Sequence, residues 1–271
     1  MKQTFEVTFL GTNGSCAYNN GKRQKYGTNT LCVAVKAGEE TLVFDTGTGF
    51  CGLSGLPGYG LDTIHLFYSH YHADHVGGLL FSPLLFEAGK NIHIYGQHNE
   101  ASDLYRIIDS FLSPPLHPVG LKEFKANLHF HAFAADSAIS LPNGVKVKTH
   151  TLSHPGGSVG YRVEYGGKAF CYCADVELAN HQNDAGLLEL MKDAELLVMD
   201  ALFEDGRVIE GWGHSSWRQC AAFARNAGAK RMALFHYHYS LTDAEIEKME
   251  HDAKKLFPDT FAAADFMRIS L

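Results

Sequence analysis

The sequence lacks several features that would place the protein in a special class. Its six cysteines form no C-x-x-C pair, and no apolar stretch is long enough to span a bilayer. It has no internal repeat, low-complexity tract or linker, and the N-terminal MKQTFEVTFLG has no apolar segment of the signal-peptide kind. These absences disfavour a disulfide-stabilised secreted protein and a membrane protein. We therefore expect a cytoplasmic protein.

The sequence also has no excess of positive charge. Lys and Arg number 23 against 30 Asp and Glu, which gives a formal net charge of -7. Binding that is dominated by phosphate contacts usually needs a basic face. We interpret the one short basic run, GKRQK at 21–25, as a solvated loop and not as a phosphate contact. The charge thus favours a small-molecule partner over nucleic acid. Independently of the charge, a homodimer is a possible assembly.

Short apolar runs separated by turn residues dominate the chain. Several of them alternate as half-buried strands do, and strand-like runs occupy 5–11, 30–37, 40–45, 63–69, 91–96, 127–133, 144–152, 158–165, 168–175, 196–201 and 231–237. Two helices have recognisable first turns, with Ser216 or Thr242 as N-cap and Gln219 or Glu245 three residues later. The length suits one domain, residues 1–271, and the order of elements favours an α/β fold with two sheets flanked by helices.

One stretch, YSHYHADHVGG at 68–78, is unusually rich in histidine. It places His70, His72, Asp74 and His75 within six positions, directly after a strand-like run. Imidazole and carboxylate groups are ligands of zinc and similar divalent ions, so the stretch predicts a metal site on a loop at a strand end.

Further candidate ligands stand at the ends of other predicted strands. His154, Asp175 and His236 each follow a strand-like run, and Asp45 ends the run ETLVFD. We expect Asp45 to hydrogen-bond a ligand histidine instead of binding metal itself. His238, two residues after His236, is an alternative to it.

Taken together, these motifs resemble the metallo-β-lactamase superfamily over residues 5 to about 240. The resemblance implies an αββα sandwich of two mixed β-sheets with two divalent metal ions between them. Zinc is the first choice, with manganese or iron as alternatives. It also implies one metal on His70, His72 and His154, a second on Asp74, His75 and His236, and Asp175 as the bridge.

A narrower resemblance rests on FLGTNGS, KYGTNTLCVAV, HPGGSVGYRVE and GWGHSSW. These stretches resemble the group that includes phosphoribosyl cyclic phosphate and cyclic nucleotide phosphodiesterases, which is related to the tRNA 3′ processing endonucleases. The resemblance implies catalytic roles for Asp74, which orients the nucleophile, and for His214, which contacts the phosphate or the leaving oxygen. The alternative for His214 is a cap on the helix that starts near Ser216.

The expected function is therefore that of a binuclear metal-dependent hydrolase. We expect a phosphodiesterase that cleaves a small (cyclic) phosphodiester with a metal-bridging hydroxide. A tRNA 3′ processing endoribonuclease is the alternative, disfavoured by the acidic charge and by the short span from His154 to Asp175, which leaves no room for an RNA-binding arm. A di-iron electron-transfer protein or a catalytically silent metal-binding protein of this fold is the alternative of another class.

The other histidines are expected to have structural roles. We expect His65, His129 and His131 to be ordinary sheet side chains, and His93, His98, His117, His181 and His251 to lie on the surface. The stretch 76–153 is expected to build the lid of the substrate pocket.

Overall fold

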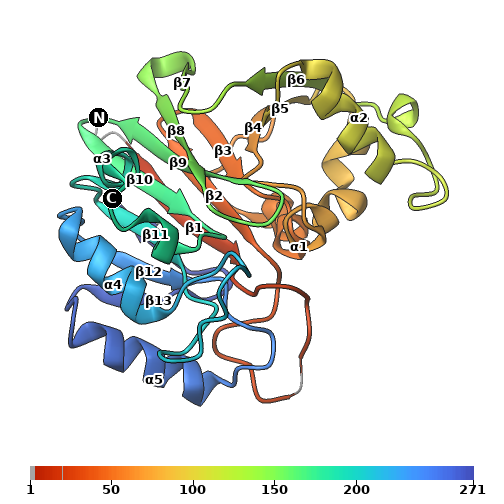
Figure 1. The fold of residues 1–271 in the computed structure, drawn as a ribbon. Helices are drawn as coiled ribbons and strands as arrows, with labels where there is room; N and C mark the ends of the chain where they lie inside the picture. Colours follow the sequence, from red (N-terminus) through yellow and green to blue (C-terminus); the bar gives the residue numbers. More distant parts are fainter. Residues whose placement is uncertain (1–3, 20) are drawn as a thin grey trace.

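The computed structural model describes residues 4–19 and 21–271, which form two β-sheets of seven strands each (Figure 1). The first sheet has the order β14 (Arg268–Ser270), β1 (Phe5–Gly11), β2 (Cys32–Ala37), β3 (Glu40–Phe44), β4 (Thr63–Phe67), β5 (Asn91–Gln97) and β6 (Asn127–Phe133). The second has the order β13 (Thr260–Ala262), β12 (Met232–Phe235), β11 (Leu196–Asp200), β10 (Lys168–Cys173), β9 (Ser158–Tyr165), β8 (Lys146–Leu152) and β7 (Ala138–Ser140). Strands β3 to β6 and β10 to β13 are parallel and the other pairs antiparallel, so both sheets are mixed, as expected.

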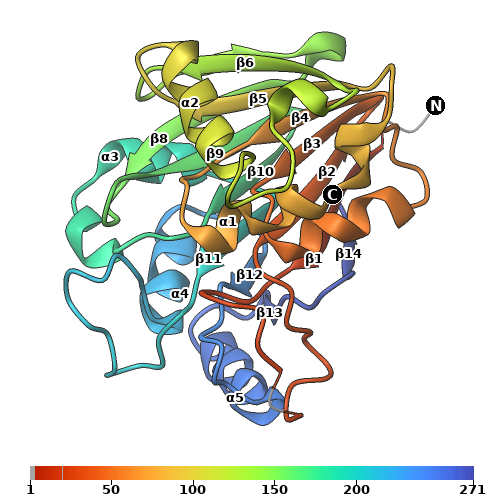
Figure 2. The same cartoon turned by 90° about the vertical axis from the view of Figure 1, so that its right-hand side faces the viewer.

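Helices cover the outer face of each sheet. The helices α1 (Ala73–Val76) and α2 (Ala101–Phe111) lie on the side of the first sheet, and α3 (Ala185–Met191), α4 (Trp217–Asn226) and α5 (Asp243–Lys254) lie on the side of the second (Figures 1 and 2). Short 3-10 helices occupy Thr48–Gly55, Gly77–Phe81, Pro83–Phe86, Leu121–Glu123, Pro142–Gly144 and Leu178–His181. The layers run helix, sheet, sheet, helix, which confirms the αββα prediction.

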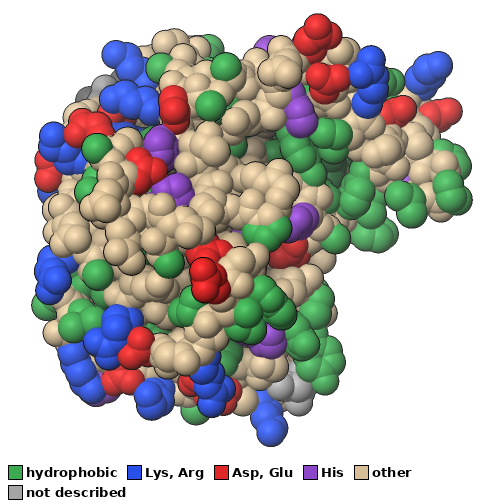
Figure 3. Space-filling model, in the orientation of Figure 1, with side chains coloured by type: hydrophobic (Ala, Val, Ile, Leu, Met, Phe, Trp, Pro, Cys, Tyr) green, Lys and Arg blue, Asp and Glu red, His purple; other side chains and the backbone are tan. Residues whose placement is uncertain are grey.

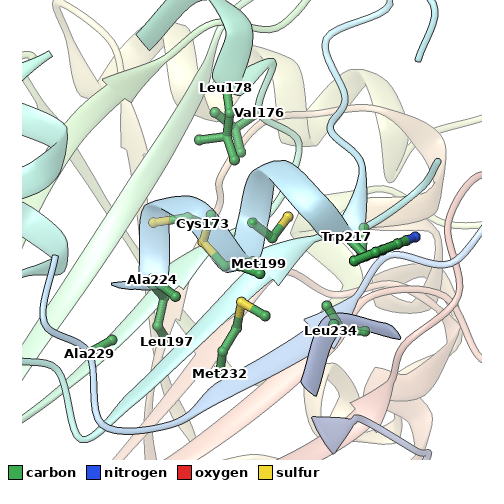
Figure 4. Packing of buried hydrophobic residues seen from close by; sticks show 14 of the residues in the cluster. Cys173, Val176, Leu178, Leu197, Met199, Trp217, Ala224, Ala229, Met232 and Leu234 are labelled. Carbon is green, nitrogen blue, oxygen red and sulfur yellow. The ribbon is translucent and has the colours of Figure 1, made fainter. Parts of the chain in front are cut away.

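The alternation of side chains along each strand produces three apolar layers. In β10, Phe170 and Tyr172 point into the layer between the sheets, whereas Cys171 and Cys173 point out toward α3 and α4. Figure 4 shows Cys173 in this outer layer beneath α4. All six cysteines are free, and the two thiols of β10 are buried.

Both predicted helix starts are confirmed. Ser216 and Gln219 form a reciprocal capping box at α4, and Thr242 and Glu245 form one at α5. Three strands were not predicted, namely β7, β13 and β14. Each has only three residues, which is too short for an alternating pattern to be recognised.

Two helices were also not predicted. The first, α2, begins after Glu100 without a side-chain cap, so its start carries no sequence signal. The second, α3, does have a cap at Asp184, but it spans only two turns. Within the described part of the chain, every helix is too short or too polar to traverse a lipid bilayer.

Candidate metal centre

The predicted ligands meet at one rim of the sandwich, where several strands end. Asp45 follows β3, the stretch His70 to His75 follows β4, Asp175 lies just beyond β10, and His236 follows β12. The carboxyl ends of parallel strands share one edge of a sheet, and this edge is where α/β proteins place their sites.

Three of these residues turn sharply as they leave their strands. Asp45, Asp175 and His236 have φ angles of 57°, 52° and 59°, in the left-handed region that non-glycine residues rarely occupy. Each such conformation costs roughly 1–3 kcal/mol and persists where the surrounding structure enforces it. The turn at each strand end thus places a candidate site residue at the rim, at a cost in stability.

The first ligand group consists of His70, His72, His154 and Asp175, whose ligand atoms all lie within 4.8 Å of one another. The Oδ2 atom of Asp175 is 3.6 Å from Nε2 of His70 and 3.6 Å from Nε2 of His154. Nδ1 of His72 is 3.2 Å from Nε2 of His154. This is the set that the resemblance implies for the first metal, with Asp175 beside it.

The second group consists of Asp74, His75 and His236. Nε2 of His75 and Nε2 of His236 lie 3.7 and 3.6 Å from Oδ2 of Asp74. The same two nitrogens lie 3.2 and 3.1 Å from Oδ1 of Asp175. One oxygen of Asp175 therefore faces each group, as a bridging carboxylate requires.

The atoms at the centre of both groups fit divalent cations. Nε2 of His70, His75 and His236 and Oδ1 of Asp175 are buried and have no hydrogen-bond partner, an arrangement that is costly unless a ligand satisfies them. Zinc ligands lie about 2.0–2.2 Å from the ion, which places neighbouring ligands of a tetrahedral site about 3.4 Å apart. The observed separations of 3.1 to 3.7 Å agree with this spacing.

Hydrogen bonds on the far side of the imidazole rings fix their orientation. Oδ2 of Asp45 accepts from Nδ1 of His75 at 2.8 Å and from the Tyr172 hydroxyl at 2.8 Å, and the Ser69 amide donates to Oδ1. Nδ1 of His154 donates to the carbonyl of Gly213 at 2.9 Å. These contacts place the protons on Nδ1 and leave Nε2 free to bind metal. Asp45 thus hydrogen-bonds a candidate ligand histidine, as expected.

Burial and neighbouring charges shift the pKa values of the ligands strongly. Burial, together with the adjacent His75, lowers the pKa of His70 to about 2, so this imidazole is neutral. Burial also lowers the pKa of His75, but Asp175, Asp45 and Asp74 outweigh it and raise the pKa well above its usual value. The centre therefore has a strong negative field, which favours cations.

His214 lies beside the metal ligands without capping a helix. Its Nδ1 is 2.8 Å from Oδ2 of Asp200, and its ring stacks on His236 with 4.8 Å between centroids. Ser216 caps α4, so the capping alternative for His214 is wrong. Asp200 was missed in the sequence, although it lies at the end of β11 much as Asp45 lies directly after β3. One further group within 4.8 Å contains Asp175, Asp200, His214 and His236.

The glycine-containing motifs allow other loops to approach the ligands closely. A Cβ on Gly14 would lie 2.5 Å from Cε1 of His236, and one on Gly213 would lie 2.3 Å from Nδ1 of His154. The Ser15 amide donates to Oδ2 of Asp74 at 2.8 Å. FLGTNGS and GWGHSSW therefore pack directly against the centre, and a larger residue would displace a ligand.

The basic run GKRQK does not behave as expected at Arg23. The Arg23 side chain is only 2% exposed, and it donates to the carbonyls of Leu241 and His238 and to the side chain of Asn13. The buried Arg23 side chain thus links the loop before β2 to the segment after His236 by hydrogen bonds. Arg23 is therefore neither solvated nor available to contact a phosphate.

Other histidines also differ from expectation. His117 and His181 are buried, not on the surface. Nε2 of His181 accepts from the Ser153 amide at 2.9 Å and Nδ1 donates to Asp184 at 2.7 Å, which fixes the backbone next to His154. His238 bonds Ser240 and belongs to none of the ligand groups found among the described residues.

Comparisons with known proteins agree with this geometry. Residues 40–237 match the family model of the β-lactamase superfamily domain. A ribonuclease Z from Methanosarcina acetivorans is 26% identical over 310 aligned positions, which cover 98% of this chain and 97% of that protein. Among solved structures, the metallo-β-lactamase fold protein YhfI from Bacillus subtilis has a TM-score of 0.73 at 19% identity, covering all of both chains. The short form of human tRNase Z has a TM-score of 0.68 at 23% identity, covering 98% of both. The chain therefore belongs to the β-lactamase superfamily, as a hydrolase of the metallo-β-lactamase fold related to ribonuclease Z.

Proposed function

We propose that this protein is a two-metal-ion phosphodiesterase that cleaves RNA, of the tRNA 3′ processing type. The observation that carries the proposal is a relative named ribonuclease Z that aligns with 98% of this chain. This relative counts against our expectation that nucleic acid is disfavoured as a partner. The small phosphodiester therefore becomes the second candidate.

The two ligand groups would hold the metal ions. His70, His72 and His154 would bind one ion, Asp74, His75 and His236 the other, and Asp175 both. Ligands made only of nitrogen and oxygen suit zinc, manganese or iron. When bound, two such ions polarise the phosphoryl oxygens and activate a water molecule at neutral pH.

Two residues of this chain would complete the chemistry. Asp74 is held by the Ser15 amide, so its carboxylate can orient the attacking water. Nδ1 of His214 is held by Asp200, which leaves Nε2 of His214 to donate a proton to the leaving oxygen. Asp200, buried and fixed by the amides of Val176 and Leu202, would stabilise the protonated imidazole before transfer.

A small (cyclic) phosphodiester is the second candidate substrate. Strands β9 and β10 are joined by a tight turn at Gly166 and Gly167, so the segment between His154 and Asp175 is a plain hairpin. Such a hairpin offers no extended arm to an RNA, and the net charge of -7 supplies little general attraction to a polyanion. The electron-transfer and catalytically silent alternatives have no such observation in their favour.

A substrate panel with metal-loaded protein tests the proposal. The panel contains a pre-tRNA with a 3′ trailer, bis(p-nitrophenyl) phosphate, cyclic nucleotides and a ribose 1,2-cyclic phosphate, each at about 50 and 200 mM salt. We expect cleavage of the pre-tRNA near its 3′ end with a steep salt dependence. Turnover of a small diester with intact pre-tRNA would select the second candidate. His72→Ala, prepared in the same way, controls for contaminating nuclease.

A further inference from the structure

The segment between β11 and α4 carries His214 to the metal centre. Figure 2 shows this segment extending away from the sheets, and Figure 3 shows hydrophobic side chains on the surface over the region that it occupies in Figure 1. Its central part, the 204–214 loop, contains only turns and bends, and Ile209 and Trp212 are 43% and 56% exposed. A loop without regular structure is mobile unless contacts fix it. The position of His214 therefore depends on what holds this loop.

The carboxylate of Glu177 holds the loop by its backbone. The Gly211 amide donates to both carboxylate oxygens at 3.0 Å, and the Gly213 amide donates to Oε2 at 3.0 Å. Both glycines have left-handed backbones, with φ of 78° and 79°, which lets nearby N–H groups converge on one anion. Glu177 is only 3% exposed, and a buried carboxylate is costly unless donors satisfy it. The carboxylate and the loop amides thus stabilise each other.

The loop that Glu177 holds supplies two groups to the metal centre. The Gly213 carbonyl accepts from Nδ1 of His154 at 2.9 Å. His214, the next residue, has its Nδ1 2.8 Å from Oδ2 of Asp200. A shift of the loop would therefore move the hydrogen-bond partner of a candidate ligand and the candidate proton donor together.

Glu177 belongs to the segment that contains the candidate bridging carboxylate. It lies two residues after Asp175. The Ser215 hydroxyl donates to the carbonyl of Val176 at 2.6 Å and accepts from the amide of Leu178 at 3.0 Å, on either side of Glu177. The loop is thus fixed on both sides of its histidine to the segment 175–178.

We propose that Glu177 is a positioning residue, whose carboxylate holds the 204–214 loop so that Gly213 orients His154 and His214 faces the metal centre. Glu177 acts through the loop and not on the reacting atoms. The role for His214 rests on the proposed phosphodiesterase function. The role for His154 rests only on the candidate metal centre, so the two can be tested separately.

The fluorescence of Trp212 reports on the loop without any turnover. The chain has two tryptophans, so Trp217→Phe leaves Trp212 as the only indole. Glu177→Gln keeps the size of the side chain but replaces one acceptor oxygen by an NH₂ group, which cannot accept from the glycine amides. In this background it should make the anisotropy of Trp212 decay faster on the nanosecond scale. Glu40→Gln is the matched control, because Glu40 is also buried and accepts hydrogen bonds at the start of β3, and it should leave the decay unchanged.

Zinc affinity is the second readout, and it also requires no turnover. Loss of the ordered Gly213 carbonyl should weaken the support of His154, so Glu177→Gln should lower the affinity for zinc about 10- to 100-fold. Competition with a chromophoric chelator measures this, and Glu40→Gln should bind zinc as the wild type does. Glu177→Asp keeps a carboxylate and should recover part of the affinity. It also provides the same comparison if Glu177→Gln does not fold.

Kinetics at saturating zinc isolate the role of His214. Glu177→Gln should lower kcat about ten-fold, the loss typical of a residue that supports the reacting groups, and leave KM within about two-fold. In a His214→Ala background the same substitution should cause no further loss, because the group that the loop positions is already missing.

The outcomes separate the two proposals. An unchanged anisotropy decay and an unchanged zinc affinity in Glu177→Gln would overturn the positioning role, whatever the protein hydrolyses. An equal loss of kcat with and without His214 would also overturn it, since Glu177 would then act through the nearby Asp175. If anisotropy and affinity change as expected but no diester in the substrate panel is cleaved, the positioning role stands and the proposed phosphodiesterase function fails.

Discussion

Two clusters of histidine lie within this one molecule, and only one of them is built to bind metal. The first is the rim cluster, made of the ligand groups around Asp175. The second is the sheet cluster, made of His65, His93, His129 and His131 on neighbouring strands β4, β5 and β6. Pairing in register places His93 between His65 and His129, with ring centroids 5.1 and 4.6 Å apart.

The clusters differ in what their ring nitrogens contact. In the sheet cluster, Nε2 of His65 lies 3.2 Å from Glu40, and Nδ1 of His93 lies 2.9 Å from Nε2 of His131. In the rim cluster, Nε2 of His70, His75 and His236 is unpaired and faces the carboxylates of Asp74 and Asp175. Four histidines in contact thus make a hydrogen-bonded stack, whereas a metal centre needs unpaired nitrogens that converge on carboxylates.

Removing one exposed histidine from each cluster should show most clearly that only the rim cluster binds metal. His72→Ala should lose metal and activity together. The ions supply several kcal/mol of transition-state stabilisation, so activity should fall at least about 1,000-fold. His129→Ala, which removes an exposed histidine of the sheet cluster, should retain both metal and activity. Metal analysis and a diester assay check this, and a metal-free wild type that is active in chelator would refute the assignment.

The next largest effect concerns His214, which touches the rim cluster without being one of the seven predicted ligands. His214→Ala should lower kcat about 100-fold, as expected when a proton donor is removed, while metal content stays near two equivalents. Steady-state kinetics and metal analysis on the same preparation test it. Loss of one metal equivalent would instead make His214 a ligand, since it lies within reach of Asp175 and His236.

A third prediction compares the carboxylates that hold one histidine in each cluster. Asp45→Asn weakens the support of His75, so metal affinity should fall roughly 10- to 100-fold. Glu40→Gln is the matched control, because Glu40 pairs with His65 in the sheet cluster. Competition with a chromophoric chelator measures both. Equal losses in the two variants would mean a general effect on folding.

The smallest expected effect is a pH dependence that belongs to the sheet cluster. Burial, with the neighbouring His65, lowers the pKa of His93 to about 4, below the usual 6.5. The unfolded chain then binds more protons between these values, so this histidine adds stability above pH 6.5 that is lost as the pH falls to about 4.

His93→Phe should therefore reduce the fall in melting temperature between pH 7 and pH 5. The metal centre is common to the variant and the wild type, so the difference between them reports on His93 and the histidines that contact it. His251→Phe, on an exposed site of α5, is the control. A pH profile identical to that of wild type in His93→Phe would contradict the shifted pKa.

Much of the fold and most of the rim cluster could be predicted from the sequence. Strands such as β1, β6 and β9 coincide with their predicted runs, because their apolar residues recur at every second position of the sequence. The short strands β7, β13 and β14 could not be predicted, since three residues carry no period. Asp200 was missed and Arg23 was misjudged, because the roles of both depend on partners distant in the chain.

The sequence by itself determined which residues are available as metal ligands and which strand end each of them follows. Local patterns carry this information, because the alternation of a strand and the density of histidine after it are properties of neighbouring residues. Only the tertiary structure decided which histidines keep unpaired nitrogens. His65 and His70 lie five residues apart, yet Glu40 pairs with the first, whereas Nε2 of the second stays unpaired beside Asp175. The hydrogen-bond partners of these side chains depend on strand register and on how the two sheets pack. Neither can be predicted from a short stretch of sequence.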